Sequence, residues 1–174
     1  NEENFTPWKK TMRKSKKSGG LILYRKDPKQ GLKFLIAHPG GPYYRNRDDG
    51  WWSIPKGEPE SGEDMLDAAK REFKEETGTE AKGPFIKLGS ITQKNGKVVH
   101  AWAFEGKWEE GKKLKCNEIT LEYPRGSGKF WTFPEIDMAI FCGLKMVKRK
   151  LRSEQFPLIE RLVSLINDDR IHRS

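Results

Sequence analysis

Residues 57–78 read GEPESGEDMLDAAKREFKEETG, and this stretch predicts a helix that begins at Ser61 and ends at Gly78. Serine is a favourable N-cap, and Asp64, three residues later, forms an approximate capping box with it. Acidic residues in the first turn suit the helix dipole, and glycine commonly ends a helix. The apolar stripe expected to face the core consists of Leu66, Ala69, Phe73 and Thr77.

The same helix gathers three carboxylates on one face. At about 100° per residue, Glu75 and Glu76 lie on either side of Glu72, within an arc of roughly 100°. Like-charged neighbours destabilise a helix by roughly 0.2–0.5 kcal/mol each, and Arg71 is placed to offset only Glu75. Carboxylates clustered beside the small Ala68 are typical of a site for Mg²⁺ or Mn²⁺. A solvated acidic face is the alternative that the spacing alone leaves open.

Before and after this helix in the sequence, apolar runs and runs that alternate apolar with polar residues predict β-strands. The two upstream strands are separated by turn-forming Asp27-Pro28 and Gly31. Downstream, Asn95-Gly96 is a strong hairpin signal between two further strands. The expected strands are Gly19–Tyr24, Lys33–His38, Phe85–Thr92, Lys97–Trp108 and Ile119–Tyr123.

Two more helices are expected in the last third of the chain. One is predicted from Pro134 through Phe141 to Leu151, and the other over Pro157–Asp168. The second has apolar residues at helical spacing, namely Leu158, Leu162, Leu165 and Ile166. Strands in the first two thirds with helices between and after them predict an α+β fold, a sheet packed by helices.

Composition narrows the class of partner. The chain has 174 residues with 34 basic and 25 acidic side chains, a net charge of +9. Such a balance favours nucleic acid, a membrane surface or a phosphorylated small molecule as partner. Residues 1–17 hold six basic and two acidic side chains, so we expect a mobile basic leader before one domain over residues 18–174. Two cysteines argue against a disulfide scaffold and predict a cytoplasmic protein, and no apolar run suggests membrane insertion.

The acidic stretch resembles the signature of the Nudix hydrolase family. Five residues separate Gly57 from Glu63, and seven more precede Arg71-Glu-Phe-Lys-Glu-Glu-Thr-Gly78, which meets every fixed position except the last. There Thr79 replaces an aliphatic residue. Residues 52–57, WSIPKG, are similar to the lead-in of the family. The resemblance covers residues 18 to about 168 and implies an α/β/α sandwich with a mixed sheet between helices.

The resemblance also implies roles for individual residues. Glu72, Glu75 and Glu76 would bind Mg²⁺ or Mn²⁺ with help from the backbone carbonyl of Gly57. The ion pair of Glu63 with Arg71 would brace the loop against the helix. A further carboxylate, acting as a metal ligand or general base, often completes such a site from outside the helix. The candidates for it are Glu135, Glu118 and Glu122.

By the same resemblance, the expected reaction is hydrolysis of a pyrophosphate bond in a nucleoside diphosphate linked to another group. The overall pattern is similar to MutT-like pyrophosphohydrolases, which favours nucleoside triphosphates or dinucleoside polyphosphates. Arg45, Arg47 and Lys56 are the expected phosphate contacts. The aromatic residues that can stack on a base are Tyr43, Tyr44, Trp51 and Trp52. Two alternatives remain: an enzyme acting on RNA 5′ ends, and a non-catalytic nucleotide sensor.

Overall fold

The computed structural model describes residues 16–111 and 114–173. Most of the predicted basic leader therefore lies outside the described residues, and β1 begins at Lys17. In chain order the elements are β1 (Lys17–Asp27), β2 (Gly31–Pro39), β3 (Lys56–Gly57), α1 (Met65–Thr77), β4 (Ile86–Thr92), β5 (Val98–Glu105), β6 (Glu118–Glu122), β7 (Phe130–Pro134), β8 (Ile136–Gly143), α2 (Leu144–Lys150) and α3 (Phe156–Arg173). In the described part of the chain, no helix has the length and apolar character needed to span a membrane.

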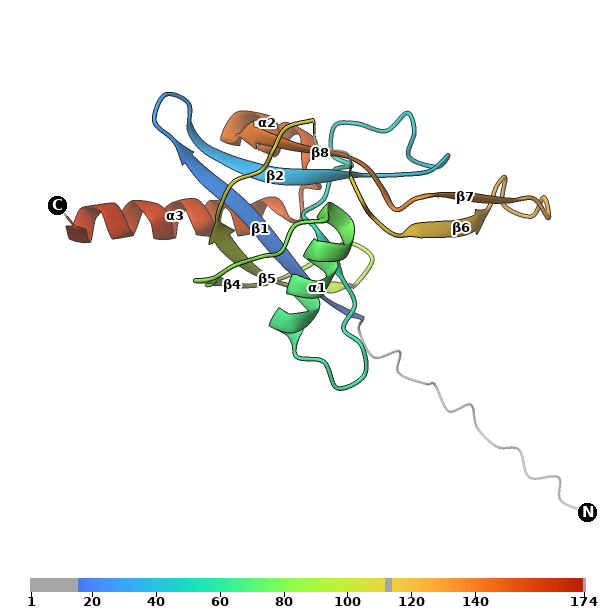
Figure 1. Cartoon of the computed structure of the whole chain (residues 1–174), viewed down its shortest axis with the longest axis horizontal. Coiled ribbons are helices and arrows are strands. Elements are labelled where there is room, and N and C mark those ends of the chain that lie inside the picture. The colour runs from blue at the N-terminus through green and yellow to red at the C-terminus, as the bar shows by residue number, and fades with distance from the viewer. Residues whose placement is uncertain (1–15, 112–113, 174) are drawn as a thin grey trace, which may run out of the picture.

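A mixed sheet forms the centre of the molecule. Its strand order is β4-β5-β1-β2-β8, and the short β3 pairs with β1. β1 and β5 run parallel, whereas the other neighbouring strands are antiparallel. Figure 1 shows α1 on one side of the sheet and α3 on the other. The predicted α+β class, with a mixed sheet between helices, is confirmed.

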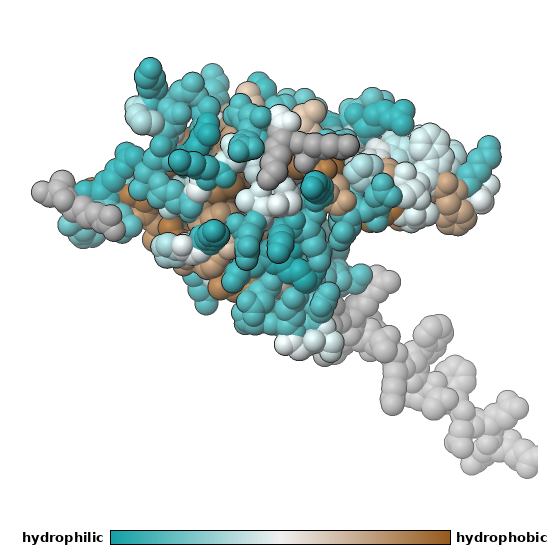
Figure 2. Space-filling model, viewed as in Figure 1, coloured by the Kyte–Doolittle hydropathy of each residue, from teal (hydrophilic) through white to brown (hydrophobic). Residues whose placement is uncertain are grey.

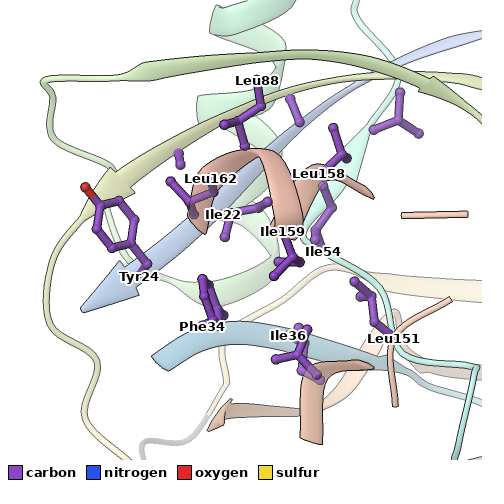
Figure 3. Packing of buried hydrophobic residues seen from close by; sticks show 14 of the residues in the cluster. Ile22, Tyr24, Phe34, Ile36, Ile54, Leu88, Leu151, Leu158, Ile159 and Leu162 are labelled. Carbon is purple, nitrogen blue, oxygen red and sulfur yellow. The ribbon is translucent and has the colours of Figure 1, made fainter. Parts of the chain in front are cut away.

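The two faces of the sheet bury different sets of apolar side chains. Because successive residues of a strand point to opposite faces, Ile22 of β1 packs towards α3, while Leu21 and Leu23 pack towards α1. Figure 3 shows the first cluster, where Ile22 lies near Leu158 and Leu162 of α3. The second cluster contains Phe73 of α1. Full burial of the Phe73 side chain stabilises the folded state by about 1.5–3 kcal/mol. The second cluster fixes α1 and its acidic face relative to the sheet, while the first fixes α3 on the other side.

Helix α1 begins later than the sequence predicts. Ser61 is not its N-cap, because residues 61 and 62 form a turn and the side chain of Asp64 accepts the N–H of Leu66. Gly62 in that turn has φ 76°, a conformation that glycine adopts without strain. The predicted end is confirmed: Gly78 is left-handed, and its N–H bonds to the carbonyl of Lys74.

The helix predicted from Pro134 to Leu151 is wrong over its first half. Residues Ile136–Gly143 form β8, and only Leu144–Lys150 are helical as α2. Within β8, Phe141 and Cys142 contact opposite clusters of the core. The stretch Ala139-Ile-Phe-Cys142 is apolar without alternation, and periodicity cannot distinguish such a short apolar run from a buried helix segment.

The remaining strands, β6 and β7, form a two-stranded ribbon that projects from the body of the molecule (Figure 1). The sequence predicted β6 but missed β7, whose Phe130 and Trp131 are exposed. Brown side chains are visible on this ribbon in Figure 2. Tyr43 ties the ribbon to the 40–50 loop, because its hydroxyl donates to the carbonyl of Glu122 at 2.7 Å. In α3, Leu165 is exposed, although the sequence placed it on the apolar stripe.

Candidate active site

The central feature of the site is the carboxylate of Glu76, which is buried on α1. Glu76 is 4% exposed, and its Oε2 has no hydrogen-bond partner among the described residues. Burial, followed by the negative charges of Glu135 and Glu72, raises the pKa of Glu76 well above its ordinary value. A buried anion without a partner is costly unless a cation joins it. Position 76 is therefore the strongest indication of a cation site.

A glycine makes room for the second acid. The ideal position of a Cβ on Gly57 would overlap the carboxyl group of Glu72, so only glycine allows this close approach between β3 and α1. Burial is the main cause that raises the pKa of Glu72, and hydrogen bonds from Arg71 act against it. Gly57 and Glu72 thus place a backbone segment directly against the acidic face.

Arg71 organises the rest of that face. Its Nε and one terminal nitrogen bind both carboxylate oxygens of Glu63 at 2.9 Å. Its other terminal nitrogen donates to Glu72 at 3.0 Å and to Glu75 at 3.2 Å. The terminal nitrogen that binds Glu63 also donates to the carbonyl of Glu58 at 3.0 Å, and this bond ties the 58–63 loop to the helix. The ion pair of Glu63 with Arg71 is present as the sequence predicted.

The acidic residues of this face differ in how available they are to a metal ion. Within residues 16–111 and 114–173, no three Asp, Glu, His or Cys side chains are already gathered closely enough to hold a metal ion. Arg71 occupies two of the acids, Glu72 and Glu75. However, the unpartnered Oε2 of Glu76 and the cradle at Gly57 both suit an oxygen-preferring divalent cation. The donor set therefore fits Mg²⁺ or Mn²⁺.

The three candidates for an extra carboxylate lie in different places. Glu135 lies between β7 and β8, and its negative charge is close enough to raise the pKa of both Glu72 and Glu76. Burial, followed by the charge of Glu75, raises the pKa of Glu135 itself. In contrast, Glu118 is exposed, and the carboxylate of Glu122 accepts the N–H of Gly128 at 2.7 Å in the ribbon. Only Glu135 adjoins the acids of α1.

Glu76 and Glu135 open onto a cleft with a volume of about 440 Å³. Basic groups line it as well, together with two aromatic residues of the 40–51 segment, Tyr44 and Trp51. Burial, followed by the positive charge of Lys97, lowers the pKa of Lys56 in this cleft. The charged residues of the lining are Lys56, Glu76, Lys94, Lys97, Glu135, Arg152 and Glu154.

Comparisons with known proteins agree with this geometry. A family model described as the NUDIX domain matches residues 18–162, which is most of the chain. The chain belongs to the NUDIX family. This match makes the chain a Nudix pyrophosphohydrolase. A sequence comparison with curated proteins returned no match.

Solved structures share the Nudix fold at low sequence identity. An Ap4A hydrolase from C. elegans, in a binary complex, is 20% identical with a TM-score of 0.59, covering 87% of this chain and 98% of that one. The NUDIX domain of Shewanella oneidensis NrtR, complexed with ADP ribose, is 14% identical with a TM-score of 0.63 and 94% coverage of both chains. A mutT/nudix family protein from Listeria innocua is 17% identical with a TM-score of 0.58, covering 90% and 96%.

The Nudix domain does not bring all the predicted phosphate contacts together. Lys56 lines the cleft, but Arg45 and Arg47 are not among the residues that line it. Arg45 is exposed, and the guanidinium of Arg47 lies over the ring of Trp51 at 5.1 Å. Their contact with substrate stays a prediction.

Sequence reasoning missed three basic residues of the Nudix cleft, Lys94, Lys97 and Arg152. Lys97 directly follows the Asn95-Gly96 turn, and Arg152 follows α2. The hairpin signal located Lys97 on the chain without giving it a role. No local pattern marks Arg152, because it reaches the cleft only through the packing of the segment between α2 and α3.

Proposed function

We propose that this Nudix domain hydrolyses a phosphoanhydride bond of a nucleoside diphosphate linked to another group, with Mg²⁺ or Mn²⁺ as cofactor. Nucleoside triphosphates and dinucleoside polyphosphates are the favoured substrates. The buried carboxylate of Glu76, whose Oε2 has no hydrogen-bond partner among the described residues and which lines the cleft with Glu135, is the observation that carries the proposal. Two of the similar structures, an Ap4A hydrolase and a NUDIX domain complexed with ADP ribose, are compatible with it.

The acids of α1 have the role of cation ligands in this proposal. Glu72, Glu75 and Glu76 would hold the divalent ion, and the carbonyl of Gly57 would assist them. A divalent ion neutralises pyrophosphate oxygens and makes water a better nucleophile. Arg71 holds Glu72 and Glu75 on the face of α1 and keeps the 58–63 loop in place.

Glu135 is the proposed base. A carboxylate oxygen of Glu135 accepts a proton from the attacking water, whose oxygen forms a new bond to phosphorus while the bridging P–O bond breaks. The leaving phosphate takes the bond electrons as an anion. Burial and the charge of Glu75 raise the pKa of Glu135, which makes it a stronger base than an exposed carboxylate.

Lys56 is the proposed phosphate contact in the cleft, and Arg45 and Arg47 are proposed contacts at its outer side. Tyr44 and Trp51 offer aromatic surface to a base, because both line the cleft. This arrangement would orient the phosphate chain between the acidic helix and the aromatic segment.

A substrate panel with matched variants tests the proposal. ATP, GTP, diadenosine tetraphosphate, ADP-ribose and 5′-triphosphorylated RNA are incubated with the protein in Mg²⁺ or Mn²⁺, and the products are identified by chromatography. We expect Glu75→Gln and Glu76→Gln to reduce turnover by at least about 10²-fold while circular dichroism stays native. The control is Glu80→Gln, because Glu80 is exposed just beyond α1.

Three results would contradict the proposal in different ways. Full turnover in both Gln variants would remove the α1 acids from the reaction. Tight nucleotide binding without turnover in either metal would favour a sensor. Hydrolysis confined to the RNA would overturn the nucleotide preference.

A further inference from the structure

The cleft carries a cluster of positive charges that the Nudix motif does not include. Lys56, Lys97 and Arg152 come from three segments that are far apart in the sequence, and all of them line the cleft. Lys97 and Arg152 are close enough to lower the pKa of Lys56 by charge repulsion, after the larger effect of burial. Like charges gathered in a concave site favour an anionic ligand.

These cations form few close ion pairs, although the charges of Glu76 and Glu58 act on Lys56, and the charge of Glu154 lies near Arg152. Among the residues that the structure describes, no carboxylate oxygen lies within 4 Å of the charged nitrogens of Lys56 or Arg152. Lys97 has one partner, Glu58, at 3.6 Å, and that carboxylate is half exposed. The guanidinium of Arg152 is positioned instead by the ring of Trp51, with its central carbon 5.4 Å from the ring centre.

A single buried amide holds the three segments together. Gln155 is fully buried, and its Oε1 accepts the N–H of Ile54 at 2.9 Å, two residues before Lys56. Its Nε2 donates to Gln93 Oε1 at 3.0 Å, at the turn that carries Lys97. Its backbone N–H bonds to the carbonyl of Arg152 at 3.0 Å. The positions of the charges are therefore set by the fold and not by salt bridges.

We propose that Lys56, Lys97 and Arg152 form a second phosphate subsite, positioned by Gln155, that binds the phosphates not held at the acidic helix. The proposal rests on the proposed function and extends it to substrate choice. A scissile pyrophosphate occupies two phosphates of a substrate, so a nucleoside triphosphate leaves only one for three cations. A chain of four or more phosphates places more phosphates beside these three cations. The enzyme therefore discriminates substrates by the length of their phosphate chain.

Binding of inorganic tripolyphosphate tests the subsite without requiring catalysis. Titration calorimetry is performed on the full chain in EDTA and low salt, because salt screens such contacts. We expect the wild type to bind and Lys97→Gln and Arg152→Gln each to weaken binding by about tenfold, as for lost hydrogen bonds to a charged group. Arg152→Lys, which keeps the charge, should retain most of the affinity. Lys29→Gln, in the exposed turn between β1 and β2, is the matched control.

A kinetic series tests the effect on substrate choice. ADP, ATP and adenosine 5′-tetraphosphate are compared in Mg²⁺, and we expect kcat/KM of the wild type to rise with chain length. Arg152→Gln should flatten this series mainly through KM, because the scissile bond is held elsewhere.

The outcomes separate this proposal from the proposed function. Unchanged tripolyphosphate binding and an unchanged chain-length series in both Gln variants would overturn the subsite while hydrolysis stands. Weakened tripolyphosphate binding in a protein that hydrolyses no nucleotide would support the anion subsite and overturn the proposed function.

Discussion

The carboxylate face of α1, here called the acidic wall, and the cluster of Lys56, Lys97 and Arg152, here called the basic wall, carry opposite charges and are stabilised in different ways. On the acidic wall, Arg71 is placed among the carboxylates and binds Glu63, Glu72 and Glu75. On the basic wall, the guanidinium of Arg152 lies against an aromatic ring and has no carboxylate within 4 Å among the described residues. Arg71 therefore neutralises much of the negative charge of the acidic wall, except at Glu76. The positive charge of the basic wall is available to a ligand.

This difference suggests which wall binds the substrate and which wall binds the cation cofactor. An anionic chain is attracted to the basic wall without a cofactor, whereas it is repelled by the acidic wall until a cation is bound there. Binding and bond cleavage are therefore assigned to different walls, and substitutions should affect them separately. Each of the following predictions tests one wall against the other.

The largest effect is expected from Gly57→Ala. A Cβ at position 57 would overlap the carboxyl group of Glu72 and displace it from its place on the acidic wall. A displacement of about 1 Å in a catalytic constellation costs roughly 10²-fold in rate, so kcat should fall by about that factor. Tripolyphosphate binding to the basic wall in EDTA should not change.

Gly143→Ala is the control for this substitution. Gly143 has φ −72°, and the nearest atom to its added Cβ would be the carbonyl oxygen of Leu32 at 4.0 Å. Native kcat in Gly57→Ala would show that Glu72 does not need its observed position.

The next largest effect is expected from Gln155→Met, which replaces the residue that positions the basic wall. Gln155→Met removes the partner of the Ile54 N–H and of Gln93 Oε1, both of which are buried with Gln155. An unsatisfied buried group costs about 1–3 kcal/mol, so we expect a loss of that size in urea denaturation. KM for adenosine 5′-tetraphosphate should rise more than kcat falls.

The same substitution at the exposed Gln30, Gln30→Met, provides the control. If Gln155→Met lost stability and kept the wild-type KM, Gln155 would be a structural residue with no influence on the basic wall.

The two walls also differ in how far the sequence could predict them. The acidic wall comes from consecutive turns of one helix, so Glu72, Glu75 and Glu76 share a face whenever that helix forms. The basic wall needs β3, the β4–β5 turn and the segment after α2 to meet around Gln155. No local spacing relates residues 56, 97 and 152, because only tertiary packing brings them together.

The errors about the fold have the same origin. The sequence predicted β1, β2 and the β4–β5 hairpin, since these have alternating or turn-bounded patterns. It mistook β8 for helix, because the apolar run from Ala139 to Cys142 shows no alternation and does not distinguish a strand from a helix. Nothing local distinguishes Asp64 from Ser61 as the cap, since the path of the 58–63 loop depends on Arg71.

A smaller effect is expected for Glu76→Gln in the metal-free protein, and it has the opposite sign. Glutamine has the same shape but no charge, so replacing this buried carboxylate, whose Oε2 has no hydrogen-bond partner among the described residues, should stabilise the protein by about 1–3 kcal/mol in EDTA near pH 8. Burial raises the pKa of Glu76, so the folded wild type binds this proton more tightly than the unfolded chain. Wild-type stability therefore falls as pH rises from the ordinary value of 4.5 through the raised one.

The gain in Glu76→Gln should consequently grow with pH and disappear in acid. Glu75→Gln is the matched control, because Glu75 already has Arg71 as a partner at 3.2 Å and should gain no stability. Thermal melts of both variants at several pH values would measure this. Equal behaviour of the two variants would mean that Glu76 is not an uncompensated charge.

The smallest effect is expected for Glu63→Gln, which removes the brace of the acidic wall but none of its proposed ligands. Hydrogen bonds from Arg71, followed by the N–H of Glu60, lower the pKa of Glu63 below 4.5. Such a carboxylate stabilises the folded state above its unfolded pKa, and this contribution is lost as pH falls through the lowered value. The melting temperature of Glu63→Gln should therefore lie below that of the wild type near pH 7 and approach it in acid. Glu60→Gln should change little, because Glu60 is 73% exposed and 3.8 Å from Arg71. A difference that persists unchanged in acid would show that charge pairing with Arg71 is not what Glu63 contributes.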